Sequence, residues 1–296
     1  MIRLSTSPLI ILGVGCVIDL HVHSTFSDGS YTPEELAEKA ARAGLSAMAL
    51  TDHDGMLGVG RYMAACQTQG VRGIPGVEIS VDYSGGTMHM LGYFMDPVNS
   101  RIDESLLKLR QGRQERNHVI LERLNKFGFL LTWDDVAKQV KEDVMGRPHF
   151  AQAMIEKGFV KNKEEAFDRY LGKGKPAYVD RFRYSVEESI SLIRESGGVP
   201  VLAHPFTLNL GRKRLRLFLA ELAEKGLQGI EAYYSEHDRD QQRFCISTAR
   251  DLGLALSGGS DFHGAMNPDI RQGVGFGNLN VPDELVDLLH ARCIQH

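Results

Sequence analysis

Nine side chains of metal-ligand types lie along this sequence, each next to a short apolar run that is typical of a strand. They are His21, His23, Asp28, His53, Glu78, His89, His204, Asp261 and His263. Two of them form a His-x-His pair in the stretch CVIDLHVHSTFSDGS, and alternate residues of an extended strand point to the same side. We therefore expect His21 and His23 to hold one ion together, with Asp28 in the following loop.

The placement of the histidines favours a metal cluster over unrelated core or surface positions. Six of the eleven histidines fall at expected strand ends, and within HVH, TDHD and SDFH a carboxylate lies beside or near the imidazole. A carboxylate that bridges two ions holds them about 3.5–4 Å apart, which suits in-line attack on phosphorus. Glu78 is the expected bridge. The expected division is His21, His23, Glu78 and Asp261 on one ion, Glu78, His89 and His204 on a second, and Asp28, His53 and His263 on a third.

The elements that must position these residues follow a strand–helix rhythm. Seven strands are predicted near residues 16–20, 46–50, 75–80, 88–93, 199–203, 228–233 and 254–258. Thr32, Pro33 and Glu35 predict the start of one helix, Ser185 with Glu188 predicts another, and a turn at residues 84–86 predicts a hairpin. A closed α/β barrel gathers the carboxyl ends of its strands at one rim, whereas an open doubly wound sheet spreads them along a line. We therefore predict a barrel.

A helical insertion interrupts this rhythm. From Arg101 to about Phe127 the apolar positions keep helical spacing, and shorter helical segments continue to roughly Arg169. We predict an α/β fold in which residues 16–98 and 182–296 form the barrel. Residues 99–181 are predicted to form a helical subdomain or lid.

Composition limits the classes of function. The 296 residues are 43% hydrophobic with a formal charge of -4, which fits a full-sized core and is too mild to attract long nucleic acid by itself. Four cysteines lie far apart, so reduced thiols and a cytoplasmic location are expected. Residues 1–15 are interpreted as an extension rather than a signal sequence, and no membrane span or obligate protein partner is expected.

The motifs HVHSTFSDGS, TDHD, GVEIS, HMLGYF, AHP and GSDFHG, in this order, resemble the PHP (polymerase and histidinol phosphatase) superfamily. The resemblance covers residues 16–98 and 182–280 and implies a distorted (β/α)7 barrel around a trinuclear metal centre. It also implies a phosphoesterase that hydrolyses its substrate through a metal-bridging hydroxide. Asp28 and the GRPH motif at residues 146–149 resemble the small standalone members that act on nucleotides.

The chemistry of the donors leaves the metal open between manganese, zinc and iron. Six imidazoles would accept zinc, but the Asp28 carboxylate hardens the third site and favours manganese. Asp52 and Asp54 flank His53 and are expected to orient its imidazole, with Asp54 a candidate for proton transfer. His237, after the sixth predicted strand, is a further catalytic candidate at the barrel rim.

Candidate substrate ligands lie in the insertion. Arg147 and Lys175 are basic residues beside glycines, which permit close approach of a phosphate. Arg113, Arg116 and Asn117 form part of a basic stripe that could hold a second phosphate or a short nucleic-acid strand, although such stripes are usually solvated.

The favoured function is therefore hydrolysis of phosphate esters of small nucleotides, such as 3′,5′-nucleoside bisphosphates. A 5′-3′ exonuclease acting on short RNA or DNA oligonucleotides would use the same ions, as would a histidinol-phosphate-type monoesterase. An amidohydrolase shares the barrel and ligand types but often includes a lysine that the strand pattern does not offer. A non-catalytic PHP module is disfavoured because all nine ligand positions are filled.

Overall fold

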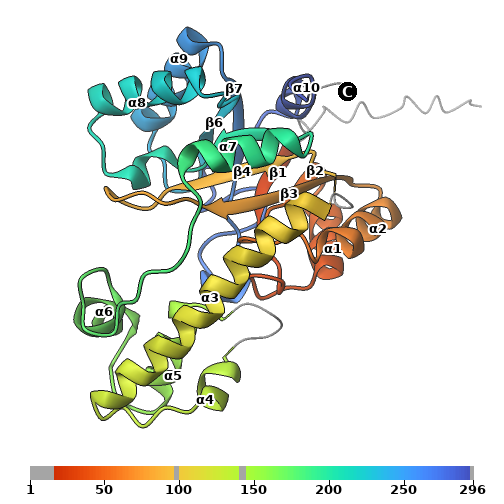
Figure 1. The fold of residues 1–296 in the computed structure, drawn as a ribbon. Coiled ribbons are helices and arrows are strands. Elements are labelled where there is room, and N and C mark those ends of the chain that lie inside the picture. Colours follow the sequence, from red (N-terminus) through yellow and green to blue (C-terminus); the bar gives the residue numbers. More distant parts are fainter. Residues whose placement is uncertain (1–16, 97–99, 140–144, 294–296) are drawn as a thin grey trace, which may run out of the picture.

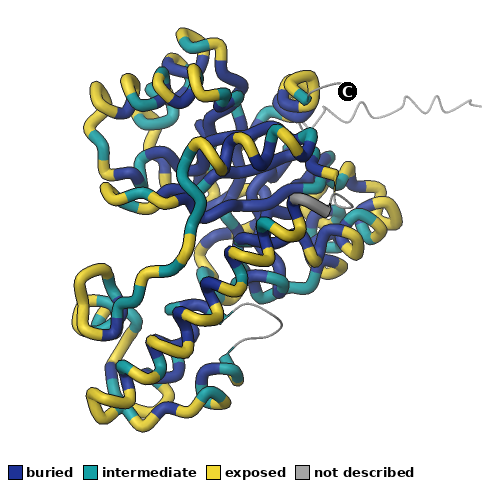
Figure 2. Tube along the Cα trace, in the orientation of Figure 1, coloured by how far each residue is buried: buried dark blue, intermediate teal, exposed yellow. Residues whose placement is uncertain are grey.

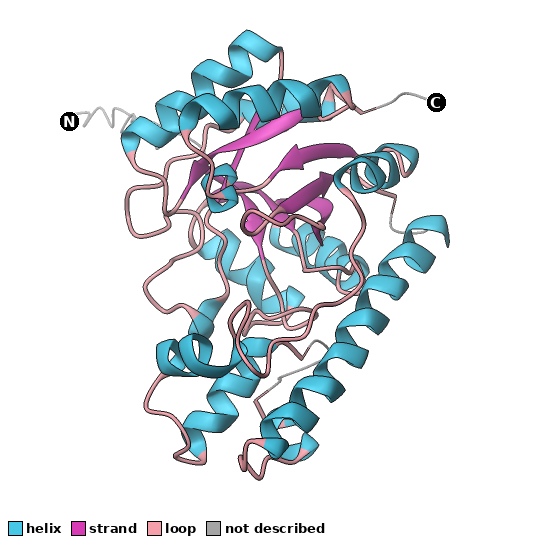
Figure 3. Cartoon of the chain, turned by 60° about the vertical axis from the view of Figure 1, so that its left-hand side comes forward, coloured by secondary structure: helices cyan, strands magenta, loops and turns pink. Residues whose placement is uncertain are grey.

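The computed structural model describes residues 17–96, 100–139 and 145–293 and contains one seven-stranded sheet in the sequential order β1 to β7. The strands are β1 (Val17–Val22), β2 (Leu45–Leu50), β3 (Arg72–Ser80), β4 (His89–Tyr93), β5 (Val199–Leu202), β6 (Gly229–Tyr234) and β7 (Ala255–Gly259). All seven predicted strands are present, and helices surround them in Figure 1 and Figure 3. The predicted α/β barrel is confirmed.

The sheet closes on itself between its first and last strands. The Asp261 amide donates to the His21 carbonyl at 2.9 Å, and the His23 amide donates to the Phe262 carbonyl at 3.0 Å. The Tyr93 hydroxyl of β4 also donates to the Leu20 carbonyl of β1 at 2.9 Å. Since β4 and β1 are far apart in strand order, this bond crosses the interior of the barrel.

The strand β4 is the exception to the parallel pattern, because it pairs antiparallel with both β3 and β5. The predicted hairpin is therefore present. His89 is the first residue of β4 rather than a residue that follows a strand. Because β4 runs in the opposite direction, its first residue lies at the same rim as the carboxyl ends of the other strands.

Among the described residues six α-helices cover the barrel, and local sequence signals explain their ends. They are α1 (Pro33–Arg42), α2 (Val59–Gln69), α7 (Val186–Glu195), α8 (Arg212–Glu224), α9 (Arg239–Leu252) and α10 (Glu284–His290). Thr32 and Glu35 form a reciprocal capping box on α1, as predicted, and Ser185 with Glu188 forms one on α7. Two short 3₁₀ turns, Pro205–Leu208 and Gly264–Met266, follow β5 and β7.

The segment between β4 and α7 is helical and has its own apolar cluster. It contains α3 (Ser100–Lys126), α4 (Trp133–Ala137), α5 (Arg147–Glu156), α6 (Lys163–Ala166) and the π-helical turn η1 (Phe167–Leu171). Ile120, Leu124, Phe150, Met154 and Leu171 pack together in that cluster. In Figure 1 the helix α3 extends from the barrel to this cluster and so connects the two parts. The domain boundaries at residues 99 and 181 stay a prediction.

Burial follows the barrel architecture. The strands are almost entirely buried, whereas the helices expose their outer faces in Figure 2. Cys66 and Cys245 are buried free thiols and Cys293 is partly buried; Cys16 and the predicted extension of residues 1–15 lie outside the described residues. Among the described helices, none combines the length and apolar character needed to cross a membrane.

Gly259 allows the closure of the barrel that positions His21. A Cβ added at Gly259 would lie 2.3 Å from the His21 nitrogen and 2.4 Å from the His21 Cβ. A side chain at residue 259 would therefore force the backbone of β1 or β7 to move. The close approach of the two strands requires glycine at this position.

We predict that Gly259→Ala lowers the free energy of unfolding by about 3 kcal/mol, the upper part of the usual overpacking range. The measurement is urea denaturation of both proteins. Gly60→Ala is the matched control, because a Cβ there meets nothing within 4 Å, and it should leave stability unchanged or raise it. Equal stability of the two variants would contradict this account of closure.

Candidate metal centre

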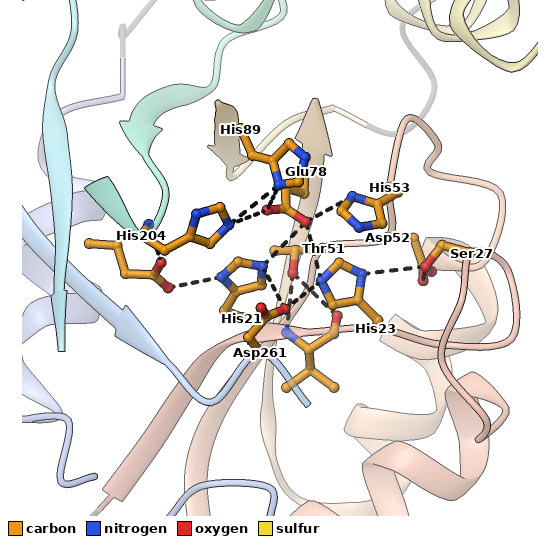
Figure 4. A network of polar contacts seen from close by, with 12 residues as sticks. His21, His23, Ser27, Thr51, Asp52, His53, Glu78, His89, His204 and Asp261 are labelled. Atoms are coloured by element: carbon orange, nitrogen blue, oxygen red, sulfur yellow. Dashed lines mark hydrogen bonds and ion pairs between the residues drawn. The ribbon is translucent and has the colours of Figure 1, made fainter. Parts of the chain in front are cut away.

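The carboxylate of Glu78 lies at the centre of a ring of imidazoles (Figure 4). Its Oε1 is 2.8 Å from His89 Nδ1 and 3.0 Å from His204 Nε2. Its Oε2 is 2.9 Å from His53 Nδ1, and the Nε2 atoms of His21 and His23 lie 3.4 and 3.3 Å from the same oxygen. The two oxygens thus face different histidines, which is the arrangement expected of a bridging carboxylate.

All nine predicted ligand residues meet at this rim. Three sets have donor atoms within 4.8 Å of one another: His21, His23, Glu78 and Asp261; His23, Asp28, His53 and His263; and His53, Glu78 and His89. The first set is the one predicted for the first ion. The other two differ from the prediction, because His23 and His53 each belong to two sets. His204 lies beside the third set, with its Nε2 3.3 Å from His89 Nδ1.

The donor atoms fit a cation. Five buried donors have no hydrogen-bond partner among the described residues: His21 Nε2, His23 Nε2, Asp28 Oδ1, His53 Nδ1 and Glu78 Oε2. An unsatisfied buried polar atom costs about 1–3 kcal/mol, so five that face one another require a common partner. Nitrogen and carboxylate oxygen donors suit divalent transition metals.

The carboxylates of the cluster are ionised, as metal ligands must be. Burial would raise the pKa of Glu78, but His89, His53 and His21 outweigh it and hold this pKa well below its usual range. The pKa values of Asp28 and Asp261 are also lowered, because neighbouring imidazoles outweigh their burial. The centre therefore presents three negative charges to a cation.

Glu231 of β6 fixes two of the predicted ligands and was not predicted. Its Oε1 lies 2.9 Å from His21 Nδ1, and its Oε2 accepts a hydrogen bond of 2.7 Å from the His204 amide. With Nδ1 engaged by Glu231, His21 directs its Nε2 toward Glu78. The signal in the sequence was a single carboxylate inside the buried run GIEAYY. Tyr234, in the same run, donates to Asp261 Oδ2 at 3.0 Å.

Asp52 orients the first loop rather than the His53 imidazole that it was expected to hold. It accepts hydrogen bonds from the Ser24 hydroxyl and the Ser27 hydroxyl, each at 2.6 Å. The Ser27 hydroxyl lies in turn 3.4 Å from His23 Nδ1. Ser27 thus contacts the Nδ1 side of His23, while its Nε2 faces Glu78 (Figure 4).

Backbone strain is concentrated at the same rim. Asp54, His204 and Asp261 adopt φ values of 55°, 24° and 57°. Such conformations cost of order 1–3 kcal/mol each and persist where the surroundings enforce them. Here the hydrogen bonds from the His204 and Asp261 amides to Glu231 and to the His21 carbonyl hold the backbone in place.

The contacts of Asp54 disagree with its expected part in proton transfer. Its carboxylate is fully buried and pairs with Arg113 at 2.5 Å and with Arg181 at 2.8 Å. Burial would raise its pKa, but the two arginines outweigh it and lower the pKa far below its usual range. A carboxylate held ionised in this way does not exchange protons near neutral pH. Asp54 instead fixes two arginines of the insertion beside the metal centre.

His237 also differs from its expected place. It is buried rather than exposed at the rim, its Nδ1 lies 3.0 Å from the Ala232 carbonyl, and its ring contacts Phe206 and Tyr234. Burial lowers its pKa. His237 does not line the cavity described next, so its position gives no support to direct catalysis.

A cavity of about 550 Å³, which we call the central cavity, opens over His53, His89 and Asp28. Its lining is rich in cations from the insertion and the segment that follows it: Arg113, Arg116, Arg147, Lys173, Arg181 and Arg183. Arg147 thus lies where it was predicted, with its guanidinium over the Tyr178 ring at 5.2 Å. Lys175 does not line the cavity, and Lys173, two residues earlier, takes that place and donates to the Ser84 carbonyl at 2.9 Å.

The residues of the predicted basic stripe on α3 have different positions relative to the central cavity. Arg113 lines the cavity while paired with Asp54, and Arg116 lines it without a carboxylate partner among the described residues. Asn117 was predicted to bind substrate, but it is fully buried and outside the cavity lining. Its amide donates to the Met145 carbonyl at 2.6 Å, and its Oδ1 accepts from Arg116, so it positions that arginine.

The chain is similar to characterised phosphoesterases over most of its length. Residues 19–188 match the PHP domain family model. The 3′,5′-nucleoside bisphosphate phosphatase of Chromobacterium violaceum is 35% identical over 247 residues, 83% of this chain and 87% of that protein. The 5′-3′ exoribonuclease of Haemophilus influenzae is 33% identical over 245 residues, which are 83% of this chain and 89% of that protein.

A solved structure agrees with these matches. A Bifidobacterium adolescentis protein assigned as a metal-dependent phosphoesterase superposes with a TM-score of 0.82 at 30% identity, covering 94% of this chain and 96% of that one. The chain therefore belongs to the PHP family. The predicted enzyme class, a hydrolase of phosphoric esters, is confirmed, and the clusters and the relatives together support dependence on divalent metal ions.

We predict that Glu231→Gln weakens metal binding by about 10- to 100-fold, as is usual when the partner of a ligating histidine is removed. Glutamine has a single acceptor oxygen, so it cannot serve both His21 and the His204 amide. The measurement is the affinity for Mn²⁺ by titration calorimetry. Glu236→Gln, an exposed neighbour, is the control and should bind like the wild type. Unchanged affinity in Glu231→Gln would refute the positioning role.

Proposed function

We propose that this enzyme hydrolyses phosphate esters of small nucleotides, with 3′,5′-nucleoside bisphosphates as its preferred class. The observation that carries the proposal is the junction of a Glu78-centred ligand cluster with a cavity lined by arginine and lysine. One phosphate of a bisphosphate lies at the cluster and the second reaches the cations. The bisphosphate phosphatase activity of the relative from Chromobacterium violaceum supports this choice of substrate.

The nine predicted ligand residues would hold the metal ions, and three manganese ions are the proposed complement. Asp28 adds a hard oxygen donor to a set with His53 and His263, which favours manganese over zinc there. When bound, such ions supply an activated water and neutralise charge on the phosphoryl oxygens. Glu78 contributes one oxygen to each side of the cluster and sets the spacing of the donors.

The protein's own cations orient the substrate. Arg147 and Lys173 lie in the insertion and line the cavity whose floor includes His53 and His89. The planar guanidinium of Arg147 suits bidentate contact with a phosphate. Lys173 is anchored on the Ser84 carbonyl of the β3–β4 hairpin, so the insertion and the barrel approach each other across the cavity mouth. This contact supports the predicted lid role of the insertion.

The location of the enzyme in the cytoplasm is likewise part of this proposal.

The test is a substrate screen of the manganese-loaded protein with 3′,5′-bisphosphates, mononucleotides and histidinol phosphate. We expect the bisphosphates to show the highest kcat/KM, because only they engage both the cluster and the cations, and we expect a chelator to abolish the activity. His21→Ala should lose hydrolysis of every substrate, which controls for contaminating phosphatases. A preference for mononucleotides or histidinol phosphate would contradict the proposed substrate class.

A further inference from the structure

The three ligand carboxylates of the metal centre differ in what their oxygens contact. Glu78 and Asp28 turn both oxygens toward imidazoles of the cluster. Asp261 faces the imidazoles with its Oδ1, which lies 3.1 Å from His23 Nε2 (Figure 4). Its Oδ2 accepts a hydrogen bond of 3.0 Å from the Tyr234 hydroxyl, the one hydrogen bond that this oxygen receives from the described residues. A residue that is not a predicted ligand therefore engages one of the two oxygens of Asp261.

The backbone around Asp261 is fixed independently of its side chain. The Ser260 amide donates to Asp19 Oδ1 at 2.8 Å, and the Ser235 hydroxyl donates to the Ser260 carbonyl at 2.7 Å. The Asp261 amide is bonded to the His21 carbonyl. The freedom that remains to Asp261 is rotation of its side chain, which is 19% exposed and therefore has room to turn.

Tyr234 is itself held in place, so it can act as a fixed donor. It is 8% exposed and pairs with Gly259 across β6 and β7. Its ring centroid lies 5.3 Å from that of His204 and 5.2 Å from that of His237. Burial raises the pKa of the Tyr234 phenol, so the hydroxyl stays protonated and donates. His237 contacts the metal centre indirectly, through this ring.

These contacts assign Tyr234 a part in the metal centre that goes beyond packing of the barrel wall. We propose that Tyr234 is a positioning residue, whose hydroxyl holds Oδ2 of Asp261 and thereby directs Oδ1 to the ion of the first donor set. This role rests on the metal complement given in the proposed function. Tyr234 does not line the central cavity, so its effect on the reaction passes through Asp261 rather than through contact with the substrate.

The positioning role predicts a loss at one ion rather than at all of them. Among the three donor sets, only the first contains Asp261, and the third, with His53 and His89, does not. Tyr234→Phe removes the hydroxyl but keeps the ring against His204. The Asp261 carboxylate is then free to turn, and a ligand that loses its outer hydrogen bond usually binds metal about 10- to 100-fold more weakly.

The test is anomalous diffraction at the manganese absorption edge from crystals of the full chain grown with limiting Mn²⁺. In Tyr234→Phe we expect the peak beside Asp261 to fall relative to the peak beside His89, which serves as the internal reference. Titration calorimetry should show the affinity of the weakened site for Mn²⁺ reduced about 10- to 100-fold.

Tyr233→Phe is the matched control. Tyr233 is the preceding residue of β6, is partly buried, and its hydroxyl forms no hydrogen bond with the described residues. Its variant should keep the wild-type ratio of the two peaks and the wild-type affinity for Mn²⁺.

An equal fall of both peaks in Tyr234→Phe overturns the positioning role, because a residue that merely supports the barrel would weaken every site. Unchanged peaks and affinity overturn it as well. A wild-type crystal without peaks at the cluster overturns the metal complement and this role together. A wild-type enzyme that prefers mononucleotides, with peaks that respond as expected, overturns the proposed substrate class and supports the role of Tyr234.

Discussion

A buried carboxylate surrounded by imidazoles is the constraint on which the rest of this structure depends. Glu78 is 1% exposed, and five histidine rings lie within about 3.5 Å of its two oxygens. Without a cation, several of these donors have no partner. The barrel must therefore close tightly enough to bring β1, β3, β4 and β5 to one point, and the loops must hold strained backbone at the rim.

The supporting contacts explain how this closure is maintained. Glu231 ties β6 to ligands on β1 and after β5, and the missing side chain of Gly259 lets β7 approach β1. Asp54 connects the insertion to the barrel, because it forms ion pairs with Arg113 and Arg181, which come from segments far apart in the sequence. The metal centre and the cationic cavity are thus mechanically connected through the residue that follows His53.

The sequence predicted that these nine residues meet, because each lies at or beside a strand end and the closure of a barrel forces such ends together. It also predicted the helix caps, which depend on residues three positions apart. It missed Glu231 and the arginine partners of Asp54, since these contacts join residues up to 210 and 127 positions apart and only the packed fold brings them together. The prediction named Lys175, whereas Lys173 lines the cavity, because the direction of a side chain in a loop cannot be derived from spacing.

The most direct test of the account is anomalous diffraction from crystals grown with saturating Mn²⁺, recorded at the manganese absorption edge. The account predicts three peaks among the nine ligand residues, with the Glu78 carboxylate contacting two of them. Absence of any peak within bonding distance of Glu78, or a single ion held elsewhere on the chain, would contradict it.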